Sequence, residues 1–197
     1  MPLGAFKAAL MGSAGVSTGS VVLLHDTDYS NAATASITSG IDSTYGEYIF
    51  HFYNMNPATD DVSFQFQVNA TDGADYNDSP IQSTYWEQRD DEGNTVNTTQ
   101  YVTGADLANA ADAFQTIMGN CGNEADESMS GRLRLFNPSS TTYVKHFIAE
   151  ASANTYNVTA VTTFVAGYIN DATAIDDIQF KMSSGNFDGT IKMWGVK

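Results

Sequence analysis

The sequence has little cysteine, little positive charge and no long apolar run, and each shortage excludes something. The single cysteine, Cys121, excludes an internal disulfide framework. Only 8 Lys and Arg stand against 23 Asp and Glu, which gives a formal net charge of −15. Such a surface repels phosphate backbones and anionic membranes, so we expect binding to neither nucleic acid nor membrane. No stretch approaches the roughly 18 apolar residues that a membrane-spanning helix needs.

The length suits a single domain. All-β sandwiches often have about 200 residues, and the chain has 197. A chain of this size buries roughly 70 % of the surface that it exposes when unfolded, so neither a disulfide nor a metal is needed for folding. We expect one domain over residues 21–197, preceded by an arm of residues 1–20.

The first 20 residues differ in composition from the rest. Leu3, Phe6 and Leu10 have helix-like spacing, and the segment from Gly12 to Ser20 is rich in Gly and Ser. An apolar tip on a flexible tether is typical of an arm that docks on another protein, which makes Leu3, Phe6 and Leu10 the candidate docking residues. The alternative is a frayed terminus or a segment that packs on its own domain.

From residue 21 onward the pattern is that of strands. Residues 62–68 alternate strictly between apolar and polar side chains, and residues 178–182 alternate in the same way. In residues 47–53 the aromatic Tyr48, Phe50 and Phe52 alternate with Glu47, Ile49, His51 and Tyr53. Residues 158–168 are apolar on both faces, which predicts a central or interface strand. Turn residues separate these runs. We therefore expect an all-β fold: an antiparallel β-sandwich of the jelly-roll type with about 8–10 strands. Residues 105–118 are either a helix or an extended loop.

The sequence offers few catalytic patterns. Residues 15–19 match G-x-S-x-G, but that nucleophile motif needs a strand before it and a helix after it, so a linker is favoured. His25, His51 and His146 have no metal-ligand spacing. A ligand set assembled from distant strands, as in cupin-type sandwiches, is the alternative for them. Cys121 has no histidine beside it, which favours a structural thiol.

Acidic clusters occur at residues 26–30, 72–78 and 123–127. The first resembles the start of a calcium loop but lacks its glycine and closing glutamate. Loop carboxylates are ordinary in so acidic a chain, and weak structural calcium is the open alternative. A polysaccharide hydrolase would need two carboxylates facing a cleft, and no spacing indicates such a pair. We expect no enzyme activity, no catalytic residue and no cofactor.

The second half resembles small virion-associated proteins of marine tailed phages, including cyanophages. The residues that carry the resemblance are 132–147, 165–168 and 178–196, and the opening residues 1–6 add to it. The resemblance implies a β-sandwich that oligomerises on a phage particle, and it implies no catalytic residues. The chain departs from a long fibre because it has neither repeats nor a coiled-coil stalk.

Together these points predict a non-enzymatic capsid decoration or cement protein on the outer surface of the virion. We expect it to bind the major capsid protein or another virion protein, and to form a symmetric oligomer, most simply a homotrimer. The alternative is a lectin-like host-recognition head on a tail or fibre. In that case exposed aromatic residues in loops, such as Tyr85, Trp86 and Trp194, would stack on sugars.

Overall fold

The computed structural model describes residues 20–71, 75–110 and 113–197, and every regular element in these ranges is a β-strand. The strands are β1 (Val21–Ala32), β2 (Ala35–Ile37), β3 (Glu47–Pro57), β4 (Val62–Ala70), β5 (Ile81–Asp91), β6 (Asn97–Tyr101), β7 (Ala108–Ala110), β8 (Gln115–Cys121), β9 (Met129–Phe136), β10 (Lys145–Asn154), β11 (Thr159–Ile169), β12 (Ile175–Met182) and β13 (Phe187–Val196). These are thirteen strands, and the short β2, β6 and β7 account for the excess over the expected number.

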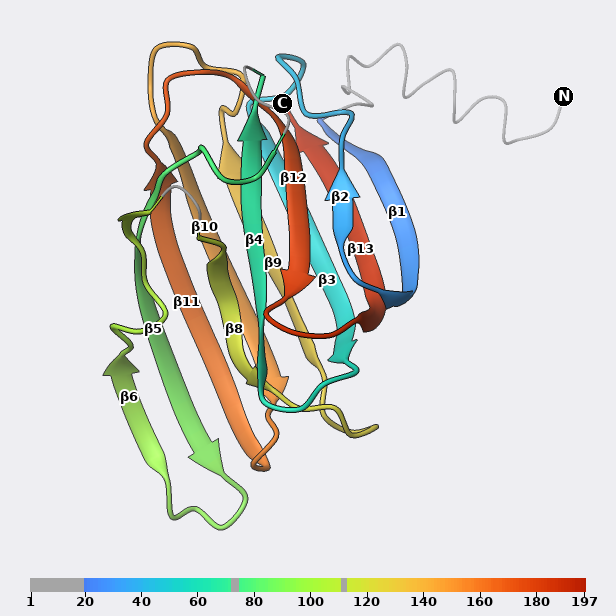
Figure 1. Ribbon diagram of the computed structural model, residues 1–197, viewed down its shortest axis with the longest axis vertical. Coiled ribbons are helices and arrows are strands. Elements are labelled where there is room, and N and C mark those ends of the chain that lie inside the picture. Colours follow the sequence, from blue (N-terminus) through green and yellow to red (C-terminus); the bar gives the residue numbers. More distant parts are fainter. Residues whose placement is uncertain (1–19, 72–74, 111–112) are drawn as a thin grey trace, which may run out of the picture.

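The strands form two antiparallel sheets that pack face to face (Figure 1). Sheet A has the order β1-β13-β3-β9-β10-β11-β5-β6, and β7 also pairs with β5. Sheet B is smaller, with the order β2-β12-β4-β8. The chain crosses repeatedly between the sheets, whereas β9, β10 and β11 follow one another within sheet A. The expected antiparallel β-sandwich is confirmed.

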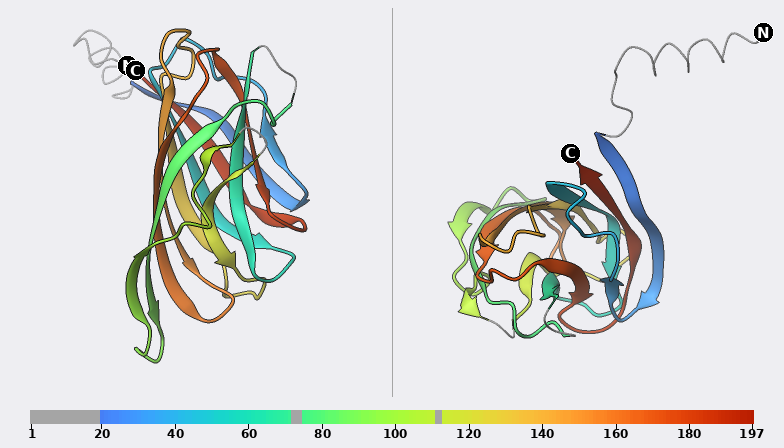
Figure 2. Two further views of the ribbon diagram at one scale, coloured as in Figure 1. Left: turned by 60° about the vertical axis from the view of Figure 1, so that its left-hand side comes forward. Right: turned by 90° about the horizontal axis from the view of Figure 1, so that it is seen from above.

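The core lies between the sheets and is rich in phenylalanine. Alternation along each strand sends every second side chain inward, as in β10, where Phe147, Ala149 and Ala151 are buried. Phe180 of β12 is the centre of the aromatic cluster, with ring centroids 5.1 Å from Phe52 and 5.5 Å from Phe50. Figure 2 shows from above how sheet A curves around the smaller sheet B. Apolar burial of this extent is the main stabilising contribution to such a sandwich.

Asparagine and aspartate supply most of the described residues that have a positive φ. Eight described residues other than glycine have a positive φ, and all are Asn or Asp except Val158. Short polar side chains tolerate this conformation, whereas a β-branched one does not. Val158 closes the β10–β11 hairpin with φ 57°, and its N–H donates to the carbonyl of Thr155 at 2.8 Å. This turn is therefore strained.

The helix considered for residues 105–118 is wrong, because the described residues of that segment form β7 and β8. Tertiary contacts override the local pattern there. The side chain of Gln115 is buried and donates to the carbonyls of Ala105 and Thr116, while its oxygen accepts from the hydroxyl of Ser83 at 2.5 Å. Strand β8 is thereby fixed at the edge of sheet B.

Side chains of sheet A cover the free edge of β8. The hydroxyl of Thr163 donates to the carbonyl of Ile117 at 2.8 Å, and the N–H of Gly119 donates to the Tyr85 hydroxyl at 3.2 Å. An edge that would otherwise expose unpaired backbone groups is thus satisfied. Burial raises the pKa of Tyr85 far above its ordinary value, so its hydroxyl stays neutral.

Candidate functional site

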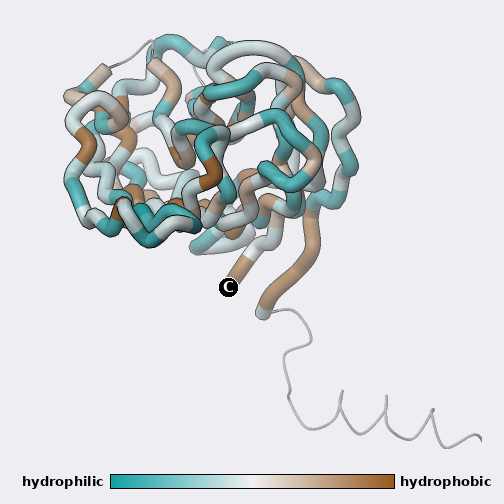
Figure 3. The backbone as a smooth tube through the Cα atoms, turned by 90° about the horizontal axis from the view of Figure 1, so that it is seen from below, coloured by the Kyte–Doolittle hydropathy of each residue, from teal (hydrophilic) through white to brown (hydrophobic). Residues whose placement is uncertain are grey.

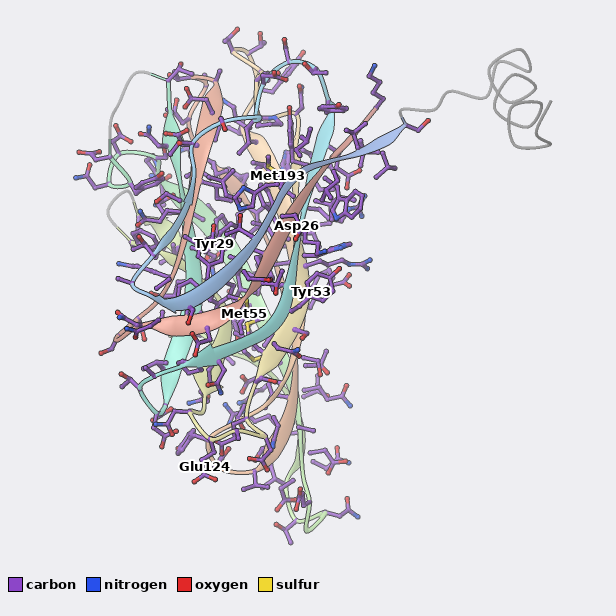
Figure 4. All side chains as sticks on the ribbon, turned by 90° about the vertical axis from the view of Figure 1, so that its right-hand side faces the viewer. Asp26, Tyr29, Tyr53, Met55, Glu124 and Met193 are labelled. Atoms are coloured by element: carbon purple, nitrogen blue, oxygen red, sulfur yellow. The ribbon has the colours of Figure 1, made fainter. Side chains whose placement is uncertain are left out.

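Sheet A has an inner face, which packs on sheet B, and an outer face, which sheet B does not cover. Side chains that point outward from neighbouring strands line up in rows across it. One row runs through Tyr101, Trp86, Phe164, Glu150, Arg132, His51, Lys192 and Asp26, which lie opposite one another in the strand register. In Figure 4, Asp26 and Tyr53 are labelled on this outer side, whereas Met55 lies toward the inside. The row joins an aromatic end to a charged middle.

A shallow depression of about 480 Å³ lies in the middle of this face. Its lining includes the side chains of His51, Tyr53, Arg132, Glu150, Ser152 and Thr162. These groups supply hydrogen-bond donors and acceptors that all open to solvent.

A β-bulge and a glycine make the depression. The register of β3 against β9 shifts between Phe52 and Met55, and the N–H of Asn54 donates to the hydroxyl of Ser130 at 3.0 Å. Gly131 follows on β9. A Cβ there would lie 2.4 Å from the carbonyl oxygen of Glu150 and 2.8 Å from the Cα of Ala151, so only glycine fits. The floor of the depression is therefore largely backbone.

Three ion pairs neutralise the middle of the face. Arg132 pairs with Glu150 at 2.8 Å and Lys192 with Asp26 at 2.9 Å, and Arg134 pairs with Glu47. These cations are three of only 8 Lys and Arg in a chain with a net charge of −15. The centre of the outer face is therefore close to electroneutral, unlike the chain as a whole.

His51 stands between two of these cations in the row. Its partner on β9 is Arg132, and its partner on β13 is Lys192. Burial, followed by the charge of Arg132, lowers the pKa of His51 below its ordinary value. The Nδ1 of His51 lies 3.3 Å from the Tyr53 hydroxyl. A neutral imidazole at this position can both donate and accept a hydrogen bond.

An aromatic ridge borders the depression, and we define it by Trp86, Tyr101 and Phe164. Their exposed fractions are 48 %, 38 % and 45 %. Trp86 lies opposite both other rings, on neighbouring strands. Tyr101 meets the indole edge to face at 5.2 Å, and its hydroxyl donates to Asp106 at 2.5 Å. The contact packs the indole of Trp86 against a ring whose own hydroxyl is hydrogen-bonded.

The expected placement of aromatic residues in loops was wrong. Tyr85 is buried and Trp86 is exposed, because alternation along β5 sends them to opposite faces. Trp194 lies on β13, half-buried. Alternation in an extended segment would have placed Tyr85 and Trp86 on opposite faces, but the polar Ser83 and Glu87 share the inner face, so the sequence does not show which face is buried. The Arg132–Glu150 and Arg134–Glu47 pairs depend on strand pairing, which local sequence does not reveal.

A second polar cluster lies between the two sheets, around Glu87. The buried Glu87 carboxylate accepts from Arg89 Nε at 2.7 Å and from the Gln100 amide at 2.6 Å. Arg89 also donates to the Asn120 side chain at 2.6 Å, and Asn120 donates to Asp61 at 2.9 Å. These bonds join β5 and β6 to β8 and to the β3–β4 turn. We interpret the cluster as a structural brace, because its central groups are paired with one another.

A third surface lies where the described chain begins and ends. Val21 and Leu23 of β1 are 56 % and 42 % exposed and lie opposite Val196 and Trp194 of β13, and Ile49 of β3 follows in the row. We call these five residues the apolar end strip. The N–H of Lys197 donates to the carbonyl of Ser20 at 3.0 Å, so the described chain begins and ends at one pole of the sandwich. Figure 3 shows the hydrophobic start of β1 extending from the body.

Several residues singled out from the sequence lie elsewhere. Leu3, Phe6 and Leu10, and the G-x-S-x-G residues 15–19, lie outside the described residues. The three histidines do not come together: His25 is on the inner side of β1, beside Tyr29, and His51 and His146 are in different rows of the outer face. Within residues 20–71, 75–110 and 113–197, no group of three or more His, Cys, Asp or Glu is arranged to hold a metal ion.

The acidic cluster at residues 26–30 is a strand and not a loop. Asp26 pairs with Lys192, and Asp28 accepts from the Thr190 hydroxyl at 2.6 Å, so the resemblance to the start of a calcium loop does not extend to the backbone conformation. Cys121 is 2 % exposed at the end of β8. Burial raises the pKa of its thiol to about 12, which suits the structural role expected for it.

Comparisons with known proteins do not assign the chain to a family. No family model matches it, and no curated protein matches it. Among solved structures, an aerolysin-like protein from Bombina maxima aligns at 12 % identity over 83 % of this chain and 95 % of that chain, with a TM-score of 0.15. In the part of the chain that the structure describes, no helix is long and apolar enough to cross a membrane.

Proposed function

We propose that the protein is a non-enzymatic structural subunit of a tailed-phage particle, of the capsid decoration or cement kind. The phage assignment rests on the sequence resemblance of residues 132–147, 165–168 and 178–196. The observation that carries the assembly role is the apolar end strip at the pole where the chain begins and ends. Two of its residues, Val21 and Leu23, are exposed on the edge strand β1, and exposed apolar residues on an edge strand mark contacts with other proteins.

The chemistry of β1 supports a contact at this pole. Residues 21–24 carry no charge, and the first charged residue of the strand is Asp26. Natural edge strands are normally protected by charges, proline or bulges. The start of β1 has neither charge nor proline, and its first register shift comes only between Leu23 and His25, so Val21 and Val22 precede these protections and are suited to pairing with another chain. The proposed contact comprises the apolar end strip together with residues 1–20, and the partner is the major capsid protein or another virion protein. Binding as a symmetric trimer is part of the proposal.

A protein that binds only the assembled shell stabilises it by mass action. At a free concentration of 100 times the dissociation constant, each site contributes about 2.7 kcal/mol to the assembled state. Many equivalent sites add up over a shell. This mechanism needs a complementary surface and no reacting group.

The test is to add purified full-length protein to expanded capsids that lack it. We expect co-sedimentation and an increase in the temperature at which the capsids disrupt. The variant Leu23→Asp together with Val21→Asp should abolish both effects. Val96→Asp is the matched control, because Val96 is 40 % exposed and lies at the distant β5–β6 turn. Failure of the wild-type protein to bind would refute the proposal, and unchanged binding of the double variant would remove the end strip from it. Deletion of residues 1–20 tests the arm separately.

A further inference from the structure

We propose that the outer face of sheet A is a binding surface for a neutral polysaccharide chain, with the aromatic ridge stacking on sugar rings and the depression binding hydroxyl groups. The aromatic ridge lies on β6, β5 and β11, whereas the apolar end strip lies on β1, β13 and β3 of the same sheet, so the two surfaces share no residue and can be altered separately.

The aromatic ridge meets the needs of sugar stacking. Trp86 and Phe164 face solvent from adjacent strands, and each is nearly half exposed. Pyranose rings present an apolar face of C–H groups, which packs on aromatic rings while the hydroxyls stay hydrated. Strands lie about 4.8 Å apart, so the ridge extends roughly 10 Å across three strands, about the length of two sugar units. Tyr101 packs edge to face against the indole.

The depression adjoins the ridge directly. Phe164 lies opposite Glu150, which lines the depression, and Thr162 lies two residues from Phe164 on the same face of β11. A linear ligand that stacks on Trp86 and Phe164 would therefore continue into the depression. There it meets the guanidinium of Arg132, which donates hydrogen bonds to hydroxyl groups, and the carboxylate of Glu150, which accepts hydrogen bonds from them. The imidazole of His51 can do both.

The charge on this face favours a neutral ligand. The guanidinium of Arg132 is already paired with Glu150, and Arg134 and Lys192 have their own carboxylate partners. No unpaired cation is thus available among them for a carboxylate or sulfate, and the net charge of −15 repels polyanions. An ion pair that remains intact can still bind hydroxyls through its outer lone pairs and N–H groups.

The surroundings favour a sugar over a protein partner. The outward neighbours of Trp86 and Phe164 along their strands are Thr84, Gln88, Thr162 and Ala166, so the ridge is a narrow apolar line bordered mainly by hydroxyl and amide groups. Protein interfaces have a broader apolar centre within a polar rim. Small-ligand sites instead combine a few apolar contacts with precisely placed polar groups, as here.

The experiment is a glycan array that contains neutral, sialylated and sulfated glycans, probed with labelled full-length protein and followed by calorimetry on the best neutral oligosaccharide. We expect binding to at least one neutral linear glycan. Trp86→Ala should weaken it by about tenfold or more, and Trp86→Phe by less. Arg132→Gln should also weaken it. Tyr143→Ala is the matched control, because Tyr143 is 71 % exposed in the β9–β10 loop, and it should leave affinity unchanged.

Three outcomes would overturn the inference. Silence across the array would do so, as would binding confined to anionic glycans, or neutral-glycan binding that survives Trp86→Ala. If Trp86→Ala instead abolishes self-association measured by sedimentation and no glycan binds, the face is a contact between copies of the chain. Thermal unfolding checks that each variant folds. Trp86→Ala should still bind capsids, which separates failure of this inference from failure of the proposed function.

Discussion

Arg132 and Glu150 face each other across β9 and β10, and the guanidinium donates to one carboxylate oxygen from Nε at 3.2 Å and from Nη2 at 2.8 Å. Their side chains are 51 % and 43 % exposed. Exposed pairs contribute little to stability, because solvent screens the attraction and ordering two long side chains costs entropy. We therefore expect a double-mutant cycle of Arg132→Gln and Glu150→Gln in urea to give a coupling free energy below about 1 kcal/mol. A coupling free energy of several kcal/mol would contradict this expectation and show that the pair contributes substantially to the stability of the fold.

The ionisation of His51 gives a second prediction. Its pKa is lowered by burial and by Arg132, so the unfolded chain binds more protons than the folded protein between that lowered pKa and the ordinary value of 6.5. The stabilisation from neutral His51 is thus complete above about pH 6.5 and is lost as the pH falls through the folded pKa. NMR titration should show a pKa for His51 below 6.5, and Arg132→Gln should raise it. The pKa of His25, on the inner side of β1, should not respond to that substitution. A wild-type His51 that titrates at or above 6.5 contradicts the geometry.

The β10–β11 turn predicts a gain in stability. Val158 has φ 57° and is 45 % exposed, so it makes little packing contribution that would offset its strain. We expect Val158→Asn to increase the free energy of unfolding by about 1 kcal/mol, because asparagine tolerates the left-handed conformation. Val96→Asn is the control: Val96 is 40 % exposed and is not among the positive-φ residues, so no gain is expected. Equal effects of both substitutions in urea unfolding would show that the strain is absent.

The thiol of Cys121 should be inert in the native protein. It is buried, and burial raises its pKa to about 12, so almost no thiolate forms at pH 8. We expect the reaction with a disulfide reagent at pH 8 to be slower in buffer than in denaturing urea by about 100-fold or more. A native rate within about tenfold of the rate in urea would show that the end of β8 opens readily.

The sequence predicts which face of a strand a residue lies on better than it predicts which strand lies beside it. Alternation identified which residues of the strand at 62–68 point inward, because the period of two is a local property of an extended chain. Pairing is not local: Val21 lies opposite Val196, and Arg134 pairs with Glu47, and neither match leaves a trace in local composition. The depression was equally hidden, because it arises from a bulge in β3 and the absence of a side chain at Gly131. Residues 105–118 were ambiguous because alanine and leucine favour a helix, whereas the buried contacts of Gln115 fix a strand.

The proposed role as a decoration subunit is tested most directly by the number of copies per particle. Quantitative mass spectrometry of purified virions, with the major capsid protein as internal standard, gives that number. A subunit that covers the symmetric shell should be present in on the order of hundreds of copies, in a simple ratio to the capsid protein. A count of about a dozen or fewer would place it on the tail, and its absence from the virion would contradict the structural role altogether.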